Sequence, residues 1–211
     1  MKLLILVLSY NDDRIFTEFM RVQQDTCDET QHQDIDVVYY YGHNGLFYNV
    51  QRELKVNCSD AYNMMHWKFK LALDAIDYHQ YDMIFRTNSC SYIVKDRILQ
   101  VAAGLPKTGC YAGYQNETYI SGAGIFMTPD VLDILRSELT PEPHGAEDVL
   151  IGDILRGRFG MVNDRSRVDA DLEGFHTTVG YHFRAKTSND LLGRVRDIEA
   201  LKELHLKLTN G

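Results

Sequence analysis

Four small polar or soft side chains follow one another where an apolar stretch ends, within IFRTNSCSYI from Ile84 to Ile93. They are Asn88, Ser89, Cys90 and Ser91. Ligands of open α/β sheets bind beyond the carboxyl ends of the strands, so a polar strand end is well placed to contact one. A turn whose side chains hydrogen-bond the local backbone uses the same residue types. This stretch alone leaves both interpretations open.

The segment YHFRAK, residues 181–186, carries three potential hydrogen-bond donors at alternate positions, His182, Arg184 and Lys186. In an extended segment these side chains point to one face. Arginine binds phosphate oxygens through paired hydrogen bonds and lysine acts as a point charge, so this face suits a diphosphate. The alternative is a solvated edge strand with a basic outer face.

The acidic pair Glu147 and Asp148 opens the helical pattern GAEDVLIGDILRG, which runs from Gly145 to Gly157. A carboxylate held at such a position can remove a proton from an attacking hydroxyl group. Acidic residues in a first helical turn also stabilise the helix dipole without any further role. The sequence pattern is compatible with both.

Several ligand-binding motifs are missing. The sequence has no GxGxxG after its first apolar stretch, no GxxxxGK[ST] and no GxSxG. The absence argues against a dinucleotide-binding fold, a P-loop and a serine nucleophile at a strand-to-helix turn. The common remaining role for a polar strand end in such a sheet is to hold a metal-bridged diphosphate.

Composition predicts a single globular domain. The chain has 211 residues, of which 45% are hydrophobic and 25% charged, and its formal net charge is −8. This acidity argues against a nucleic-acid partner, because such a surface needs clustered Lys and Arg. The four cysteines are widely spread, which favours reduced thiols and a cytoplasmic location. The apolar run near Met1 ends at Leu8, so we expect a buried strand there and no membrane span in the chain.

Strand and helix patterns alternate along the chain. Apolar positions predict strands and helices in the order that follows: strand 3–9, helix 12–24, strand 35–42, a helix after Ser59 to about Ile76, strand 81–88, helix 96–103, short strands in CYAGY and AGIFMT, and helices from Pro129, over 145–157 and over 191–208. The first strand, LLILVL, is apolar throughout, as expected when both faces of a sheet are covered. The pattern predicts an α/β fold with a central, mainly parallel mixed sheet flanked by helices.

The order of these motifs resembles the GT-A-type glycosyltransferases, and most of all the small ones of large algal (chlorella) DNA viruses. The motifs are LSY after the first strand, DAYNMMHWKFKLALDAI, YDMIFRTN, SGAGIFMT, EDVLIGDIL and YHFRAK. The resemblance covers Met1 to about Lys186. It implies a GT-A-like domain over residues 1–190. The spacing of apolar residues after it predicts a helix within 191–211 that packs on this domain, and the chain could be one domain of a longer protein. One departure is clear: the family's Asp-x-Asp motif is replaced by residues 88–91.

The resemblance also implies roles at the reaction centre. Asp148 or Glu147 would be the catalytic carboxylate, with Asp148 preferred because its shorter side chain is more rigid. His182 would bind Mn²⁺ or Mg²⁺ together with Ser89 and Ser91. Hydroxyl oxygens are weak ligands for such hard ions, so the ion would depend on the phosphates of the donor.

The remaining implied residues would bind the donor. Residues for the nucleotide and diphosphate are Ser9, Tyr10, Asp12, Asp60, Lys68, Asn88, Ser89, Ser91, Arg184 and Lys186; those for the sugar are Gly122, Gly124 and Trp67. Some of these residues have an alternative explanation without a ligand. Asp60 could cap a helix, and Lys68 could be a solvated surface side chain. The two glycines could form an ordinary turn, and Trp67 could pack in the core.

The predicted function is transfer of a hexose, by default glucose, from a UDP-sugar to a saccharide or glycoprotein-glycan acceptor, in the host cytoplasm if the protein is viral. Two alternatives from other classes remain. One is a nucleotide-sugar-binding module without turnover, suggested by the missing Asp-x-Asp. The other is a metal-dependent phosphohydrolase, for which the acidic ligand clusters are absent. The sequence leaves open the donor sugar, the acceptor, the linkage, the stereochemistry and the oligomeric state.

Overall fold

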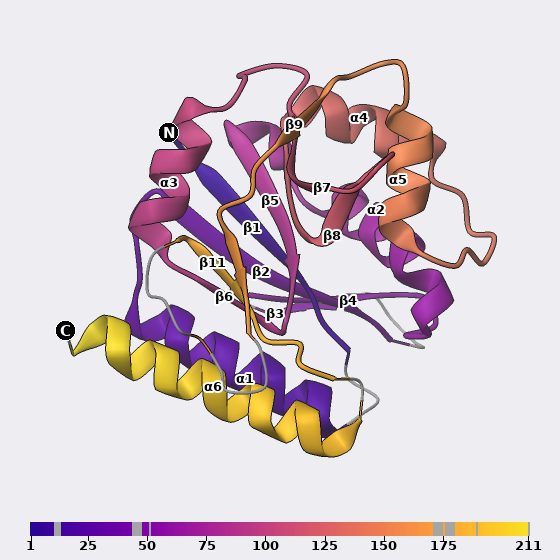
Figure 1. The fold of residues 1–211 in the computed structure, drawn as a ribbon. Coiled ribbons are helices and arrows are strands. Elements are labelled where there is room, and N and C mark those ends of the chain that lie inside the picture. Colours follow the sequence, from indigo (N-terminus) through magenta and orange to yellow (C-terminus); the bar gives the residue numbers. More distant parts are fainter. Residues whose placement is uncertain are drawn as a thin grey trace.

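A computed structural model provides the structure of the protein and describes residues 1–10, 14–43, 48–50, 52–170, 175, 180–188 and 190–210. In these residues an eight-stranded mixed sheet is flanked by helices on both faces, and a three-stranded sheet lies beside it (Figure 1). The α/β fold predicted from the sequence is confirmed. No helix among the described residues is long and apolar enough to cross a membrane.

The main sheet has the strand order β3-β4-β2-β1-β5-β8-β7-β9. Its strands are β1 Leu3–Leu8, β2 Ile35–Gly42, β3 Tyr48–Val50, β4 Glu53–Val56, β5 Met83–Asn88, β7 Tyr111–Gln115, β8 Ile120–Met127 and β9 Met161–Asn163. The pairs β1–β2, β1–β5, β2–β4 and β7–β9 are parallel, whereas β8 runs antiparallel to both β5 and β7. The start of β8 therefore lies beside the end of β5, with Gly124 opposite Thr87.

Helices cover both faces of the sheet, which is why β1 is apolar at every position. They are α1 Arg14–Glu29, α2 Met65–Ala75, α3 Lys95–Gly104, α4 Pro129–Glu138, α5 Glu147–Leu155 and α6 Leu191–Thr209, with short 3-10 turns η1 Tyr62–Met64 and η2 Tyr78–Gln80. Leu4 and Leu6 of β1 pack with α2, α4 and α5, whereas Ile5 and Val7 pack with α1 and α3. Alternate side chains of one strand thus fill two different cores.

The three-stranded sheet brings YHFRAK to the polar strand end. Its order is β10-β11-β6, with β10 at Arg167–Asp169, β11 at His182–Arg184 and β6 at Ser91–Ile93. Arg184 pairs with Ser91, and His182 with Ile93. Since β11 is the central strand, the alternative of a solvated edge strand is wrong. This sheet packs on α1 and α6, which lie side by side in Figure 1.

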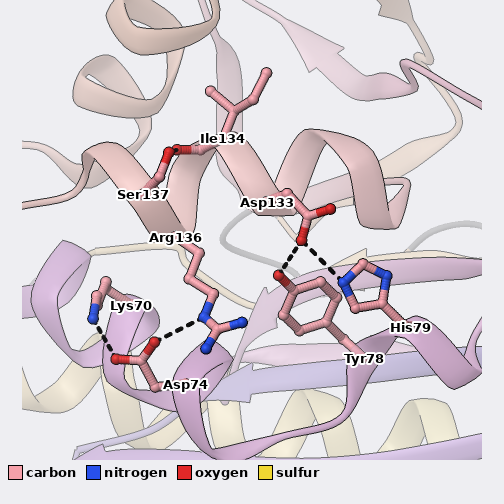
Figure 2. Close-up of polar contacts among 8 residues, drawn as sticks. All are labelled: Lys70, Asp74, Tyr78, His79, Asp133, Ile134, Arg136 and Ser137. Atoms are coloured by element: carbon pink, nitrogen blue, oxygen red, sulfur yellow. Dashed lines mark hydrogen bonds and ion pairs between the residues drawn. The ribbon is translucent and has the colours of Figure 1, made fainter.

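A polar network holds α4 against α2 and η2 (Figure 2). Asp133 of α4 accepts a hydrogen bond from the hydroxyl of Tyr78 at 2.6 Å and lies 3.0 Å from Nε2 of His79. Arg136, one turn further along α4, donates from Nε to Asp74 of α2 at 2.9 Å. None of these residues lines the cleft described below, so the network serves the packing of the helices.

The packing of Gly124 generates a first prediction. A Cβ atom there would lie 2.6 Å from Cε1 of His182 and 2.7 Å from Cζ of Phe85. Gly124→Ala should therefore lower the free energy of unfolding by about 1–3 kcal/mol, the range for overpacked cores. Urea denaturation measures the change. Gly104→Ala, where a Cβ meets nothing within 4 Å, is the matched control and should be close to neutral. Equal stability of both variants would contradict tight packing at Gly124.

Candidate functional site

One cleft of about 770 Å³ lies where β1 and β5 end and β8 begins. Most of the site residues expected from the sequence line it: Ser9, Tyr10, Asp60, Lys68, Asn88, Ser89, Gly122, Glu147, Asp148, Arg184 and Lys186. Because β8 runs antiparallel to β5, its first residues, including Gly122, lie beside the end of β5. Helix α5, which begins at Glu147, lies next to them. Segments far apart in the sequence thus form a single site.

A buried ion pair forms one wall of the cleft. Arg86 of β5 contacts the carboxylate of Glu147 through Nη2 and the backbone oxygen of Gly122 through Nη1. Only 3% of either charged side chain is exposed. Burial raises the pKa of the Glu147 carboxyl, while the guanidinium of Arg86 acts in the opposite direction. The pair therefore joins β5, β8 and α5 at the cleft.

Asp148 presents its carboxylate beside that ion pair. Its Oδ2 accepts a hydrogen bond from the backbone nitrogen of Gly122 at 2.9 Å, and its Oδ1 accepts one from Val149 at 3.1 Å. Unlike Glu147, it is partly exposed and forms no ion pair with a cation of the described residues. Both acidic side chains also lie in the first turn of α5, where negative charge is favourable. Asp148 is thus the member of the pair that is available to a ligand.

A second buried ion pair closes the side of the cleft next to β2. Lys68 donates to Oδ1 of Asp60 at 2.6 Å and to its backbone oxygen at 2.9 Å, and each side chain is 2% exposed. The backbone nitrogen of Gly42 donates to the same carboxylate oxygen at 2.9 Å. The ammonium group also lies 5.7 Å from the ring of Tyr10. Asp60 and Lys68 therefore neutralise each other and fix the end of β2 to α2.

The polar strand end is held by hydrogen bonds within its own loop. Oδ1 of Asn88 accepts from Sγ of Cys90 at 3.0 Å and from Oγ of Ser91 at 3.1 Å. Nε2 of His182 lies 2.9 Å from Oγ of Ser91. Gln23 of α1 donates to the backbone oxygen of Ser91 at 2.5 Å. These contacts fix the loop at the edge of the cleft.

The predicted metal ligands are not arranged as a ready coordination shell. His182 is buried, does not line the cleft, and already uses Nε2 to contact Ser91, which does not line it either. Ser89 lines the cleft but offers only a neutral oxygen. Across the described residues, no group of three or more His, Cys, Asp or Glu is placed to hold an ion. As placed, these side chains do not fit Mn²⁺ or Mg²⁺. The ion stays a prediction.

Two cations in the cleft have no acidic partner. Among the described residues, the side chains of Arg184 and Lys186 make no hydrogen bond or ion pair. Other cations that line the cleft are paired, as Arg86 is with Glu147 and Arg194 with Asp197. Partial burial and the neighbouring guanidinium groups of Arg184 and Arg194 lower the pKa of Lys186. Positive charge is therefore concentrated here, in a chain of net charge −8.

Two further expected residues, Trp67 and Gly124, also lie outside the cleft. Trp67 is on α2, outside the cleft, where the ammonium group of Lys70 lies 5.2 Å from its ring. Gly124 packs against His182 within the core. Asp12 lies outside the described residues. The roles predicted for these residues in binding the donor remain untested.

Sequence reasoning did not assign a role to three residues that line the cleft, Arg86, Ser121 and Arg194. Arg86 carried a readable signal, because a charge inside an apolar strand must find a buried partner. Ser121 reaches the cleft through the antiparallel register of β8, and Arg194 through the packing of α6 on α1. No local pattern predicts either contact.

Comparison with known proteins gives a structural likeness. No family model and no curated protein matches the sequence. Among solved structures, the chain is similar to the crystal structure of a glycosyltransferase involved in the glycosylation of the major capsid of PBCV-1. The TM-score is 0.61 at 12% sequence identity, and the match covers 96% of this chain and 100% of the other. At this identity the likeness shows a shared fold, and assignment to the GT-A type stays a prediction.

The buried imidazole of His182 generates a prediction about pH. Burial, with further contributions from Arg167 and Arg184, lowers its pKa well below the ordinary 6.5. Below pH 6.5 the unfolded chain therefore binds a proton that the folded protein does not, and stability falls as the pH drops. His182→Gln should flatten this fall by up to about 1.4 kcal/mol per pH unit. Urea denaturation between pH 7.5 and 5 measures both slopes. Identical slopes would contradict a neutral buried His182.

Proposed function

We propose that the protein transfers a hexose, by default glucose, from a UDP-sugar to a carbohydrate acceptor. The observation that carries the proposal is the charge pattern of the cleft, with the unpaired cations Arg184 and Lys186 and the partly exposed carboxylate of Asp148 among its lining residues. A departing diphosphate needs positive charge, and an attacking hydroxyl group needs a proton acceptor. The fold shared with a glycosyltransferase supports this interpretation.

The donor would lie along the ends of β1 and β5. Ser9 and Tyr10 follow β1, the position at which α/β sheets commonly receive a nucleotide. The Ser9 hydroxyl is buried and has no partner among the described residues, so a ribose or phosphate oxygen would satisfy it. Arg184 and Lys186 would contact the diphosphate, the first through paired hydrogen bonds and the second as a point charge.

In the proposed reaction the acceptor oxygen forms a bond to the anomeric carbon as the bond from that carbon to the phosphate oxygen breaks. The electron pair leaves with UDP, whose new charge Arg184 and Lys186 stabilise. In an inverting transfer Asp148 takes the hydroxyl proton. In a retaining transfer the departing phosphate oxygen of UDP takes that proton, and Asp148 stabilises positive charge on the sugar. The hydrogen bond from Gly122 orients this carboxylate. Glu147, neutralised by Arg86, holds the helix that carries it.

A second candidate is a nucleotide-sugar-binding module without turnover. It is favoured by the strand end at Asn88 and Ser91, which carries no carboxylate and whose side chains bond one another. Incubating the protein with UDP-sugars and a panel of saccharides, and following UDP release, separates the two candidates. Release that depends on the saccharide indicates transfer, whereas binding without release indicates a module.

Asp148→Asn tests the catalytic carboxylate. The substitution keeps the shape and removes the charge, so transfer should fall by about a hundredfold or more while UDP binding and folding are retained. Asp153→Asn is the matched control: Asp153 lies on the same helix, is half exposed and pairs with Arg156 at 2.6 Å, so transfer should be unchanged. Rates are measured as acceptor-dependent UDP release. Normal turnover of Asp148→Asn would refute this assignment.

The metal dependence predicted from the sequence has its own test. The side chains alone provide few ligands for a metal ion. Mn²⁺ should therefore bind weakly to the free protein and more tightly when UDP supplies phosphate oxygens as ligands. Titration calorimetry with and without UDP measures both affinities. Tight binding of Mn²⁺ without nucleotide would contradict the prediction.

A further inference from the structure

The segment that carries Lys186 is held by the C-terminal helix. Oδ1 of Asp197 in α6 accepts hydrogen bonds from the backbone nitrogen of Thr187 at 3.0 Å and from its hydroxyl at 2.8 Å. Arg194, one turn earlier, donates from Nη1 to the backbone oxygen of Ala185 at 3.3 Å. The residues on both sides of Lys186 are thus bonded to α6.

These two side chains of α6 are fixed in turn by one another and by α1. Arg194 and Asp197 form a buried ion pair at 3.2 Å, and Asp197 is fully buried. The guanidinium group lies 5.8 Å from the ring of Phe16 and 5.6 Å from that of Phe19, both in α1. Their position therefore depends on the packing of α6 against α1.

A third contact secures the same segment from the strand-end loop. The backbone nitrogen of Ala185 donates to the backbone oxygen of Cys90 at 2.8 Å. Ala185 is itself fully buried, whereas the side chain of Lys186 is exposed in the cleft. The backbone on which Lys186 stands is therefore anchored, while its ammonium group remains available to an anion.

We infer that Asp197 and Arg194 are positioning residues that hold Lys186 against the diphosphate of the donor. This inference rests on the proposed function for the identity of the anion. It assigns α6 a role in donor binding in addition to its role in packing. A purely electrostatic role for Asp197 predicts the reverse effect, since removing a negative charge near the site would favour an anion.

Titration of the 211-residue protein with UDP in EDTA tests the inference. Asp197→Asn removes the charge that pairs with Arg194, and Thr187→Val removes only the hydroxyl contact to Asp197. If positioning matters, Asp197→Asn should weaken UDP binding about tenfold, and Thr187→Val should weaken it in the same direction to a smaller extent. Glu199→Gln removes an equal charge from the exposed face of α6 and should leave UDP binding unchanged. Thermal unfolding verifies that each variant is folded.

A double variant shows whether the effect acts through Lys186. Lys186→Met should weaken UDP binding by itself, and adding Asp197→Asn to it should cause little further loss, because the positioned group is already gone. Fully additive losses, or tighter binding by Asp197→Asn, would overturn the inference and leave the diphosphate site standing. If Lys186→Met binds UDP normally, the diphosphate site of the proposed function fails, and the positioning role fails with it.

Discussion

The buried ion pair of Arg86 and Glu147 fixes the geometry on which the cleft depends. Removing two charges from water is expensive, and the cost is offset only when the charges meet with good geometry and additional hydrogen bonds. Arg86 contacts both the carboxylate of Glu147 and the backbone oxygen of Gly122, which offsets part of this cost. One guanidinium group thereby links the end of β5, the start of β8 and the first turn of α5. The position of Asp148, next in sequence to Glu147, follows from this link.

The same principle separates structural charges from charges available to a ligand. Lys68 and Arg194, like Arg86, line the cleft and each meets a buried carboxylate. Such pairs fix neighbouring elements and leave little net charge for binding. Arg184 and Lys186 differ because they have no acidic partner among the described residues. Their mutual repulsion is a cost in the free protein that an anion would relieve.

Sequence reasoning reached the fold and most of the cleft, and its failures have specific causes. Consecutive apolar residues in LLILVL correctly indicated a strand covered on both faces. The period of a strand predicted a shared face for His182, Arg184 and Lys186, but it gave no information on how deeply each side chain is buried. Because β11 is the centre of a small sheet under α1 and α6, His182 is buried against Gly124, whereas Lys186 emerges at the cleft. The period of a strand gives the direction of a side chain and carries no information on what covers it.

The sequence by itself determined local properties: the positions of the helices and of the longer strands, the polar residues after β5, and the acidic pair that opens α5. These properties depend on neighbouring residues, through hydrophobic periodicity and the chemistry of helix ends. The short strands β3, β4, β6, β9 and β10 were not predicted. Only the tertiary structure decided which charges are paired. Arg86 meets Glu147 across 61 positions of sequence, and His182 meets Ser91 across 91. Contacts of that separation arise from strand order and helix packing, so the division between paired and available charge appears only in the folded protein.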